Sequence, residues 1–178
     1  MNSDEIFRRL AVSLAIGLLI GLERGWRARE ESEGERAAGL RTHALSGLLG
    51  GVAGLVATTA GPLTLGLAFA AFTAAIGAFH WLEARANQDF SVTGVVAGML
   101  AFMLGAYAIV GDLQIAVGAG VATTILLALK RPLHGWLQRI TWIEIRATLI
   151  LLAMTFLFLP ILPDRPVDPW DAINPATV

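Results

Sequence analysis

A long apolar stretch that ends in a charged pair constrains this chain more than any other feature of its sequence. Residues 10–22 are almost all apolar and run directly into Glu23 and Arg24. After a charged connection, residues 39–43 (Gly-Leu-Arg-Thr-His) open a second apolar stretch. Such stretches favour a bilayer, whereas ionisable groups near hydrocarbon are expensive and are functional candidates by default. The pattern therefore predicts membrane-spanning helices with ionisable groups at their ends.

The composition makes a bilayer a better solvent for this chain than water. Of the 178 residues, 56% are hydrophobic and 15% are charged, whereas soluble domains are about 45–50% apolar and about 25% charged. The net charge is −1 and the charges are segregated along the chain, so no nucleic-acid partner is expected. The absence of cysteine excludes disulfides and thiolate chemistry.

Six stretches approach the roughly 20 apolar residues that a transmembrane helix needs. They are residues 7–22, 40–60, 63–82, 92–110, 113–129 and 145–162. The first is interpreted as a retained span, not a cleaved signal peptide. A further segment has apolar residues at three- and four-residue spacing, which predicts a short interfacial helix: Leu133, Trp136, Leu137 and Ile140. We therefore expect an all-α integral membrane protein with about six transmembrane helices and one short interfacial helix.

The distribution of basic residues predicts the orientation of these spans. Ten of the 13 lysines and arginines fall in connections on one side of the membrane, and the positive-inside rule makes that side cytoplasmic and both termini external. We expect a transmembrane bundle over residues 7–162 and a proline-rich external tail over 163–178. In an alternative arrangement of five spans, the fourth and fifth stretches merge into a re-entrant element, which places the C-terminus inside.

Glycines repeat at four-residue spacing within the spans, and such rows let helix backbones approach closely in lipid. The glycines expected at helix contacts are Gly17, Gly21, Gly47, Gly50, Gly51, Gly54, Gly94 and Gly98. One interpretation is packing within the bundle, and the other is a subunit interface through the span at residues 40–60.

Polar residues near the predicted cytoplasmic helix ends form a candidate functional cluster. Its members are Glu23, Arg24, Arg41, Thr42, His43, His80, Glu144 and Arg146. A Glu23–Arg41 pair, or a pair of Arg24 with a glutamate, either fixes the helical hairpin or gates an ion or solute path. The span centres lack the carboxylates that magnesium prefers, and no enzyme motif is present. We expect no metal site, no cofactor and no catalytic residues.

Two segments resemble a known family. Residues 20–30 (IGLERGWRARE) and 39–55 (GLRTHALSGLLGGVAGL) are similar to the N-terminal membrane domain of the MgtC/SapB family of bacterial inner-membrane proteins. The resemblance covers residues 10–130. The end of the chain is similar to the junction in a longer subgroup, where a second multi-span domain of unknown function follows.

The resemblance implies a multi-pass protein of the bacterial inner membrane linked to growth under magnesium limitation. It directs attention to Glu23, Arg24, Gly39, Arg41 and Thr42, which fall on the family motif. We expect a non-enzymatic regulator or partner module in ion homeostasis, in contact with membrane lipid and with another membrane protein or further copies of itself. The alternative is a subunit of an ion or small-solute channel or transporter, gated by the Glu/Arg cluster.

Overall fold

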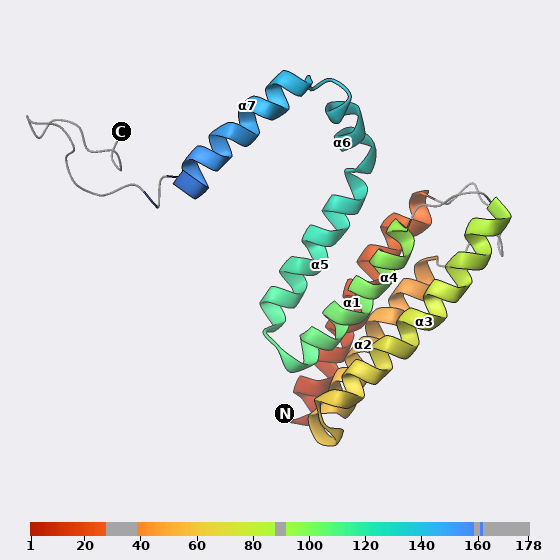
Figure 1. The fold of residues 1–178 in the computed structure, drawn as a ribbon. Helices are drawn as coiled ribbons and strands as arrows, with labels where there is room; N and C mark the ends of the chain where they lie inside the picture. The colour runs from red at the N-terminus through yellow and green to blue at the C-terminus, as the bar shows by residue number, and fades with distance from the viewer. Residues whose placement is uncertain (28–38, 88–91, 159–160, 162–178) are drawn as a thin grey trace, which may run out of the picture. The chain divides into compact units, whose positions relative to one another are not determined.

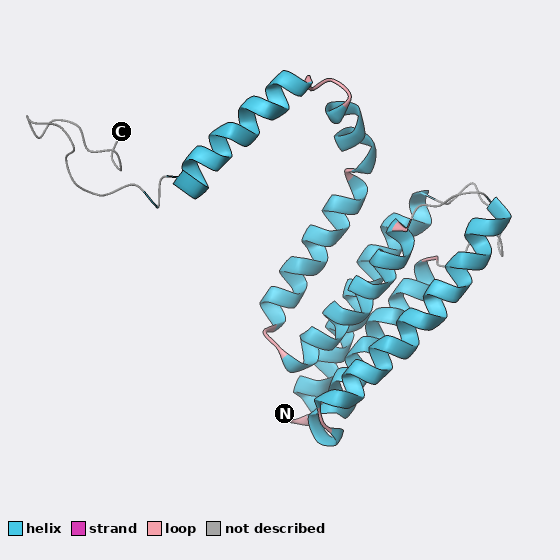
Figure 2. Cartoon of the chain, in the orientation of Figure 1, coloured by secondary structure: helices cyan, strands magenta, loops and turns pink. Residues whose placement is uncertain are grey.

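The computed structural model describes residues 1–27, 39–87, 92–158 and 161. The chain divides into two compact units, Met1–Leu129 and Lys130–Val178. The described residues are almost entirely helical and contain no strand (Figure 2). The prediction of an all-α membrane protein is therefore confirmed.

Five helices form the first unit: α1 (Ser3–Arg27), α2 (Leu40–Ala60), α3 (Pro62–Asn87), α4 (Thr93–Val110) and α5 (Leu113–Ala128). They alternate in direction (Figure 1). The end of α1, the start of α2, the end of α3 and the start of α4 consequently lie at one end of the unit, which we call the motif end. The start of α1 and the tight α2–α3 and α4–α5 turns lie at the other, which we call the turn end.

The tight turns follow from their residues. Gly61 has a φ of 97°, a conformation that residues with a Cβ rarely adopt, and Pro62 then begins α3. Asp112 caps α5, since its carboxylate accepts hydrogen bonds from the backbone N–H groups of Gln114 and Ile115, at 2.8 and 3.0 Å.

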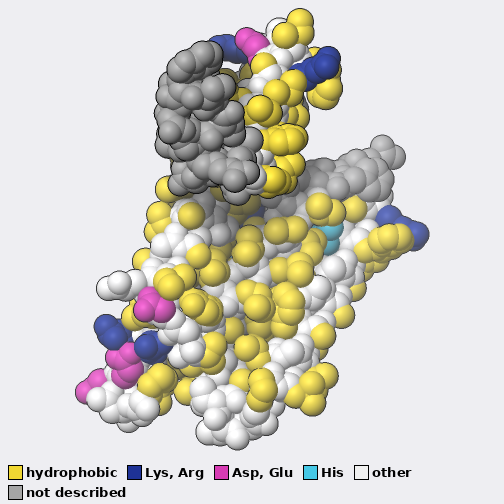
Figure 3. All heavy atoms as spheres, turned by 60° about the vertical axis from the view of Figure 1, so that its left-hand side comes forward, with side chains coloured by type: hydrophobic (Ala, Val, Ile, Leu, Met, Phe, Trp, Pro, Cys, Tyr) yellow, Lys and Arg dark blue, Asp and Glu magenta, His cyan; other side chains and the backbone are white. Residues whose placement is uncertain are grey.

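Within the described residues, α2, α4 and the Pro62–Arg85 part of α3 are long and apolar enough to cross a membrane. Helix α5 is apolar but shorter, and α1 is longer than the predicted span because charged residues extend it at both ends. Figure 3 shows hydrophobic side chains across the visible face of the first unit, with charged side chains toward its ends. This distribution suits a bilayer core between two polar interfaces.

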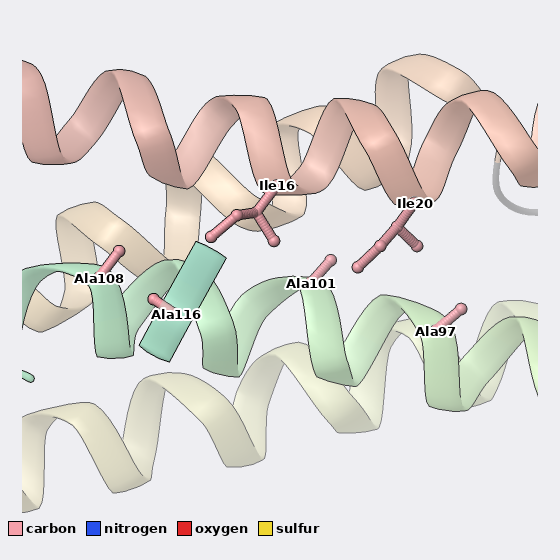
Figure 4. Close-up of a cluster of buried hydrophobic side chains, with 6 residues drawn as sticks. All are labelled: Ile16, Ile20, Ala97, Ala101, Ala108 and Ala116. Atoms are coloured by element: carbon pink, nitrogen blue, oxygen red, sulfur yellow. The ribbon is translucent and has the colours of Figure 1, made fainter. Parts of the chain in front are cut away.

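A cluster of buried hydrophobic side chains is shared by α1, α4 and α5. Figure 4 shows Ile16 and Ile20 of α1 directed toward alanines of α4 and α5, all at most 2% exposed. Alanine side chains are small, so these helices approach closely around the two isoleucines. By contrast, α3 lies at the edge of the bundle, where Phe72 stacks on Phe102 of α4 with ring centroids 5.0 Å apart.

The second unit contains α6 (Lys130–Leu137), α7 (Trp142–Ala153) and a π-helical turn, Met154–Phe158. Helix α6 overlaps the segment predicted as a short interfacial helix but ends at Leu137, before Ile140, and its position in the interface stays a prediction. A capping box starts α7, in which Thr141 and Glu144 satisfy each other's backbone N–H groups. The predicted tail at 163–178 lies outside the described residues.

Candidate functional site

A buried ion pair at the end of α1 forms the centre of the candidate site. The Nε of Arg24 donates a hydrogen bond to Oε2 of Glu23 at 2.6 Å, and the two side chains are 13% and 8% exposed. Neighbouring helix residues do not normally face each other, so both side chains turn back against the bundle to meet. Removing either partner would leave a buried charge uncompensated, which is strongly destabilising.

His43 of α2 adds a buried imidazole to this pair. Its side chain is 1% exposed, and its Nδ1 lies 3.0 Å from the carbonyl oxygen of Gly39. Because a carbonyl only accepts, Nδ1 is the donor and Nε2 carries the lone pair. The ring lies within electrostatic range of Glu23 and Arg24 and near the backbone of Gly94. Three helices therefore meet at this buried polar cluster.

Two glycines of α1 allow His43 to reach the ion pair. A Cβ at Gly21 would lie 2.7 Å from the carbonyl oxygen of Leu40 and 3.1 Å from the Cβ of His43. A Cβ at Gly17 would collide with the carbonyl of His43 itself. The glycine row and the charged motif are thus parts of one arrangement, in which close backbone contact buries the polar residues.

The other predicted members of the cluster lie elsewhere. Arg41 and Thr42 are exposed on the surface of α2. His80 of α3 is 3.2 Å from the carboxylate of Glu83, on its own helix. Glu144 and Arg146 belong to the second unit, so a ring that joins them to Glu23 stays a prediction.

Most of the predicted glycines contact a neighbouring helix. On α2, a Cβ at Gly47 or Gly51 would meet Ser13 of α1, and one at Gly50 or Gly54 would meet the α4 backbone. A Cβ at Gly98 of α4 would lie 2.5 Å from the Cδ1 of Ile76. A Cβ at Gly94 would meet nothing within 4 Å among the described residues. The glycine faces of α2 are therefore occupied by contacts within the first unit.

Sequence reasoning missed two polar residues of α1, Arg9 and Ser13. The guanidinium of Arg9 donates hydrogen bonds to the carbonyls of Ala108, Ile109 and Gly111, at 2.9, 3.2 and 3.0 Å, at the end of α4. The fully buried Ser13 donates to the carbonyl of Gly105 at 2.8 Å. A signal was present, since Arg9, Ser13, Gly17 and Gly21 recur every four residues and share one helix face.

An apolar groove runs along α2 beside Phe72 of α3, and we call it the α2–α3 groove. Its volume is about 490 Å³. It is lined by Thr42, Leu45, Ser46, Leu48, Leu49, Val52 and Phe72. The only polar side chains in this lining are Thr42 and Ser46, which lie toward the motif end, and the hydroxyl of Ser46 is already bonded to the carbonyl of Thr42 at 2.7 Å.

These features define an all-α membrane protein with a largely buried Glu23–Arg24 pair at one end of a glycine-packed bundle. The chain belongs to the MgtC family, whose model matches residues 10–136, and the resemblance noted in the sequence is confirmed. At the level of the family, membership supports a membrane protein of magnesium or ion homeostasis. The MgtC family is not a known enzyme family. Neither the curated proteins nor the solved structures gave a match to this chain.

Proposed function

We propose that this protein is a non-catalytic regulator or partner module of the bacterial inner membrane, acting in magnesium-related ion homeostasis through contacts with another membrane protein or further copies of itself. One observation carries this proposal: the Glu23–Arg24 pair of the motif is largely buried, with side chains 8% and 13% exposed, and the buried His43 lies near it, whereas Arg41 and Thr42 stay exposed. A polar layer of this kind fixes the shape of the motif end, which a partner then recognises.

The packing beyond the cluster supports a regulator more than a conduit. Between the motif end and the turn end, Phe102 and Ile20 are 0% exposed, and Ser13 uses its hydroxyl within the bundle. A Cβ at Gly105 would collide with the carbonyl of Gly47, so α2 and α4 are in backbone contact near the middle of both helices. An ion path along this interface requires the two backbones to separate.

The outer face of α3 is the surface that we propose for a protein partner. Only 6% of its membrane window is buried within the bundle, compared with 50% of that of α2. Exposed apolar residues are expected on any lipid-facing helix. Because α3 makes so few contacts within the first unit, its outer face is also available to another protein.

The proposed orientation has the motif end in the cytoplasm and the N-terminus outside. In support, the alternating helices place the start of α1 and Asp112 at the turn end, away from the arginine-rich first connection (Figure 1). The natural absence of cysteine makes the test direct. In Asp4→Cys, Arg41→Cys and Asp112→Cys variants, a membrane-impermeant maleimide should label the first and third in intact cells, and Arg41→Cys only after permeabilisation. The reverse pattern would refute the orientation.

Two experiments test the function itself. A photo-crosslinking residue in place of Phe79, which is 65% exposed on α3, should capture one partner in native membranes at a fixed stoichiometry. The same residue in place of Phe102, which is 0% exposed, should give only intramolecular products. Capture of no protein at Phe79 would count against the proposal.

The full chain in liposomes should pass no more Mg²⁺, K⁺ or protons than protein-free vesicles, with an ionophore added last to show that the vesicles report flux. Flux above that background, abolished by Glu23→Gln, would instead establish the alternative of a gated channel or transporter subunit.

A further inference from the structure

The α2–α3 groove has the size of a ligand site and opens toward the membrane. Its volume of about 490 Å³ falls within the roughly 300–1,000 Å³ of small-molecule sites. Two residues of its wall, Leu45 and Leu49, are 62% and 49% exposed, so an occupant enters from the side. Because α2 and the Pro62–Arg85 part of α3 are candidate membrane spans, the side entrance faces lipid.

The length of the groove matches one leaflet of a bilayer. It extends along α2 from Thr42, close to the motif end, to Val52. At 1.5 Å per residue this is about 15 Å, which is half of the roughly 30 Å hydrocarbon core. A lipid acyl chain from the leaflet at the motif end reaches the same depth.

The walls favour a flexible hydrocarbon chain over a transmembrane helix. Helix seams in membranes are built from small residues that let backbones approach, and the glycines of α2 already contact α1 and α4. The groove is instead walled by leucine, valine and phenylalanine side chains, such as Leu48, Val52 and Phe72. An acyl chain packs against such side chains without close backbone contact.

Among the described residues, the side chain next to the motif end of the groove is positively charged. Arg41 precedes Leu45 by four residues and therefore lies on the same face of α2. It is exposed, and it makes no hydrogen bond or ion pair with another described residue. The first turn of α2 has no acidic residue and no side-chain cap, and Glu83 of α3 is bonded to His80. An anionic headgroup at Arg41 complements this charge.

From the groove and its charge together, we propose that the α2–α3 groove binds one anionic glycerophospholipid, with an acyl chain between α2 and α3 and the phosphate at Arg41. The site requires only that α2 crosses the membrane. It depends neither on the direction of crossing nor on the regulatory function proposed above, so either proposal can fail alone.

The test uses the full chain reconstituted in phosphatidylcholine vesicles that contain a trace of photoactivatable phosphatidylglycerol or photoactivatable phosphatidylcholine, each with a diazirine in the acyl chain. After irradiation, peptide mapping should place phosphatidylglycerol adducts on the 45–52 segment of α2 and on Phe72. One arginine near an anionic headgroup gives roughly a fivefold preference, so phosphatidylglycerol should exceed phosphatidylcholine there by about that factor.

Three variants separate the headgroup site from the groove. Arg41→Gln should abolish the preference for phosphatidylglycerol while adducts of both lipids persist, and Leu49→Trp should remove the adducts of both by filling the groove. The matched control is Arg85→Gln. Arg85 lies on α3, 4.8 Å from the centroid of the Trp81 ring, and is not next to the lining of the groove. This variant should leave the labelling by both lipids unchanged.

Two results would overturn the proposal: adducts spread evenly over the exposed faces of α3 and α5, or equal labelling of the groove by the two lipids.

Discussion

The close contact of α2 with α4 makes a sharp prediction, because the same substitution should have opposite effects at two glycines. In Gly50→Ala, the new Cβ would collide with the carbonyl oxygen of Phe102 and would lie 2.7 Å from its carbonyl carbon and 3.0 Å from its Cα. Ordinary contact begins near 3.4 Å. In Gly66→Ala, the new Cβ meets nothing within 4 Å among the described residues.

The expected magnitudes follow from these distances. To accommodate Gly50→Ala, the carbonyl carbon of Phe102 must retreat by at least about 0.7 Å, and its carbonyl oxygen, which lies closer, by more. A gap of about 0.7 Å already forfeits roughly a quarter to a half of the dispersion attraction along the seam. Overpacking costs about 1–3 kcal/mol, and the higher helix propensity of alanine offsets up to about 1 kcal/mol. We expect a net loss of about 1–2 kcal/mol for Gly50→Ala and a gain of up to about 1 kcal/mol for Gly66→Ala.

The assay is equilibrium unfolding of both variants and the wild-type chain in the same detergent micelles, followed by circular dichroism. A difference of about 2 kcal/mol between the variants is roughly thirtyfold in the unfolding constant, well within measurement. If Gly50→Ala is as stable as Gly66→Ala, the α2–α4 backbone contact does not exist in the folded protein and the packing argument is refuted.

Three further predictions concern the polar groups. Arg9→Gln should lower the free energy of unfolding by about 2 kcal/mol, since charge-assisted hydrogen bonds to the end of α4 are lost. The control is Arg8→Gln, which changes an exposed side chain and should have little effect in the same assay. Equal effects of the two substitutions would contradict the role of Arg9. Glu23→Gln should destabilise by about 3 kcal/mol because it strands the charge of Arg24, whereas the double variant with Arg24→Gln should recover part of the loss; additive losses would argue against the pair. Hydrogen bonds from the backbone and side chain of Thr141 lower the pKa of Glu144. The ionised Glu144 therefore stabilises α7 at neutral pH. This stabilisation is lost as the pH falls below the unfolded-state pKa of about 4.3 and through the folded-state pKa. Amide exchange in the first turn of α7 should rise over that range in the wild type and be insensitive to pH in Glu144→Gln once intrinsic exchange is subtracted.

The helices were predictable because each depends on local sequence. The lengths of the apolar stretches predict the bounds of α2 and α4 to within one residue, and the turn residues Gly61 and Asp112 fix the two helical hairpins. The predicted first span ended at Leu22, while α1 continues to Arg27, since a helix continues past the apolar segment where charged side chains find solvent or partners. Hydropathy therefore predicts where a helix leaves the hydrocarbon core, and it does not predict where the helix ends.

The partners within the site were less predictable, because they depend on which helix ends become neighbours. The sequence left open whether Glu23 pairs with Arg41, and the structure pairs it with the adjacent Arg24 instead. The orientation of α2 about its own axis decides which residue faces Glu23. Close contact with the glycines of α1 directs His43 inward, and Arg41 consequently faces outward. Likewise, only the position of the α4 terminus beside α1 reveals the carbonyl partners of Arg9.

The hydrogen bonds of Arg9 also bear on how the protein is made. Its carbonyl partners lie 99 to 102 residues further along the chain. At a synthesis rate of about 5–20 residues per second, they emerge roughly 5–20 s after Arg9 itself. Before then, the guanidinium of Arg9 has only its partner within α1, the carboxylate of Glu5, which lies 2.6 Å away in the folded protein. The hydrogen bonds that join the start of α1 to the end of α4 therefore form late in synthesis.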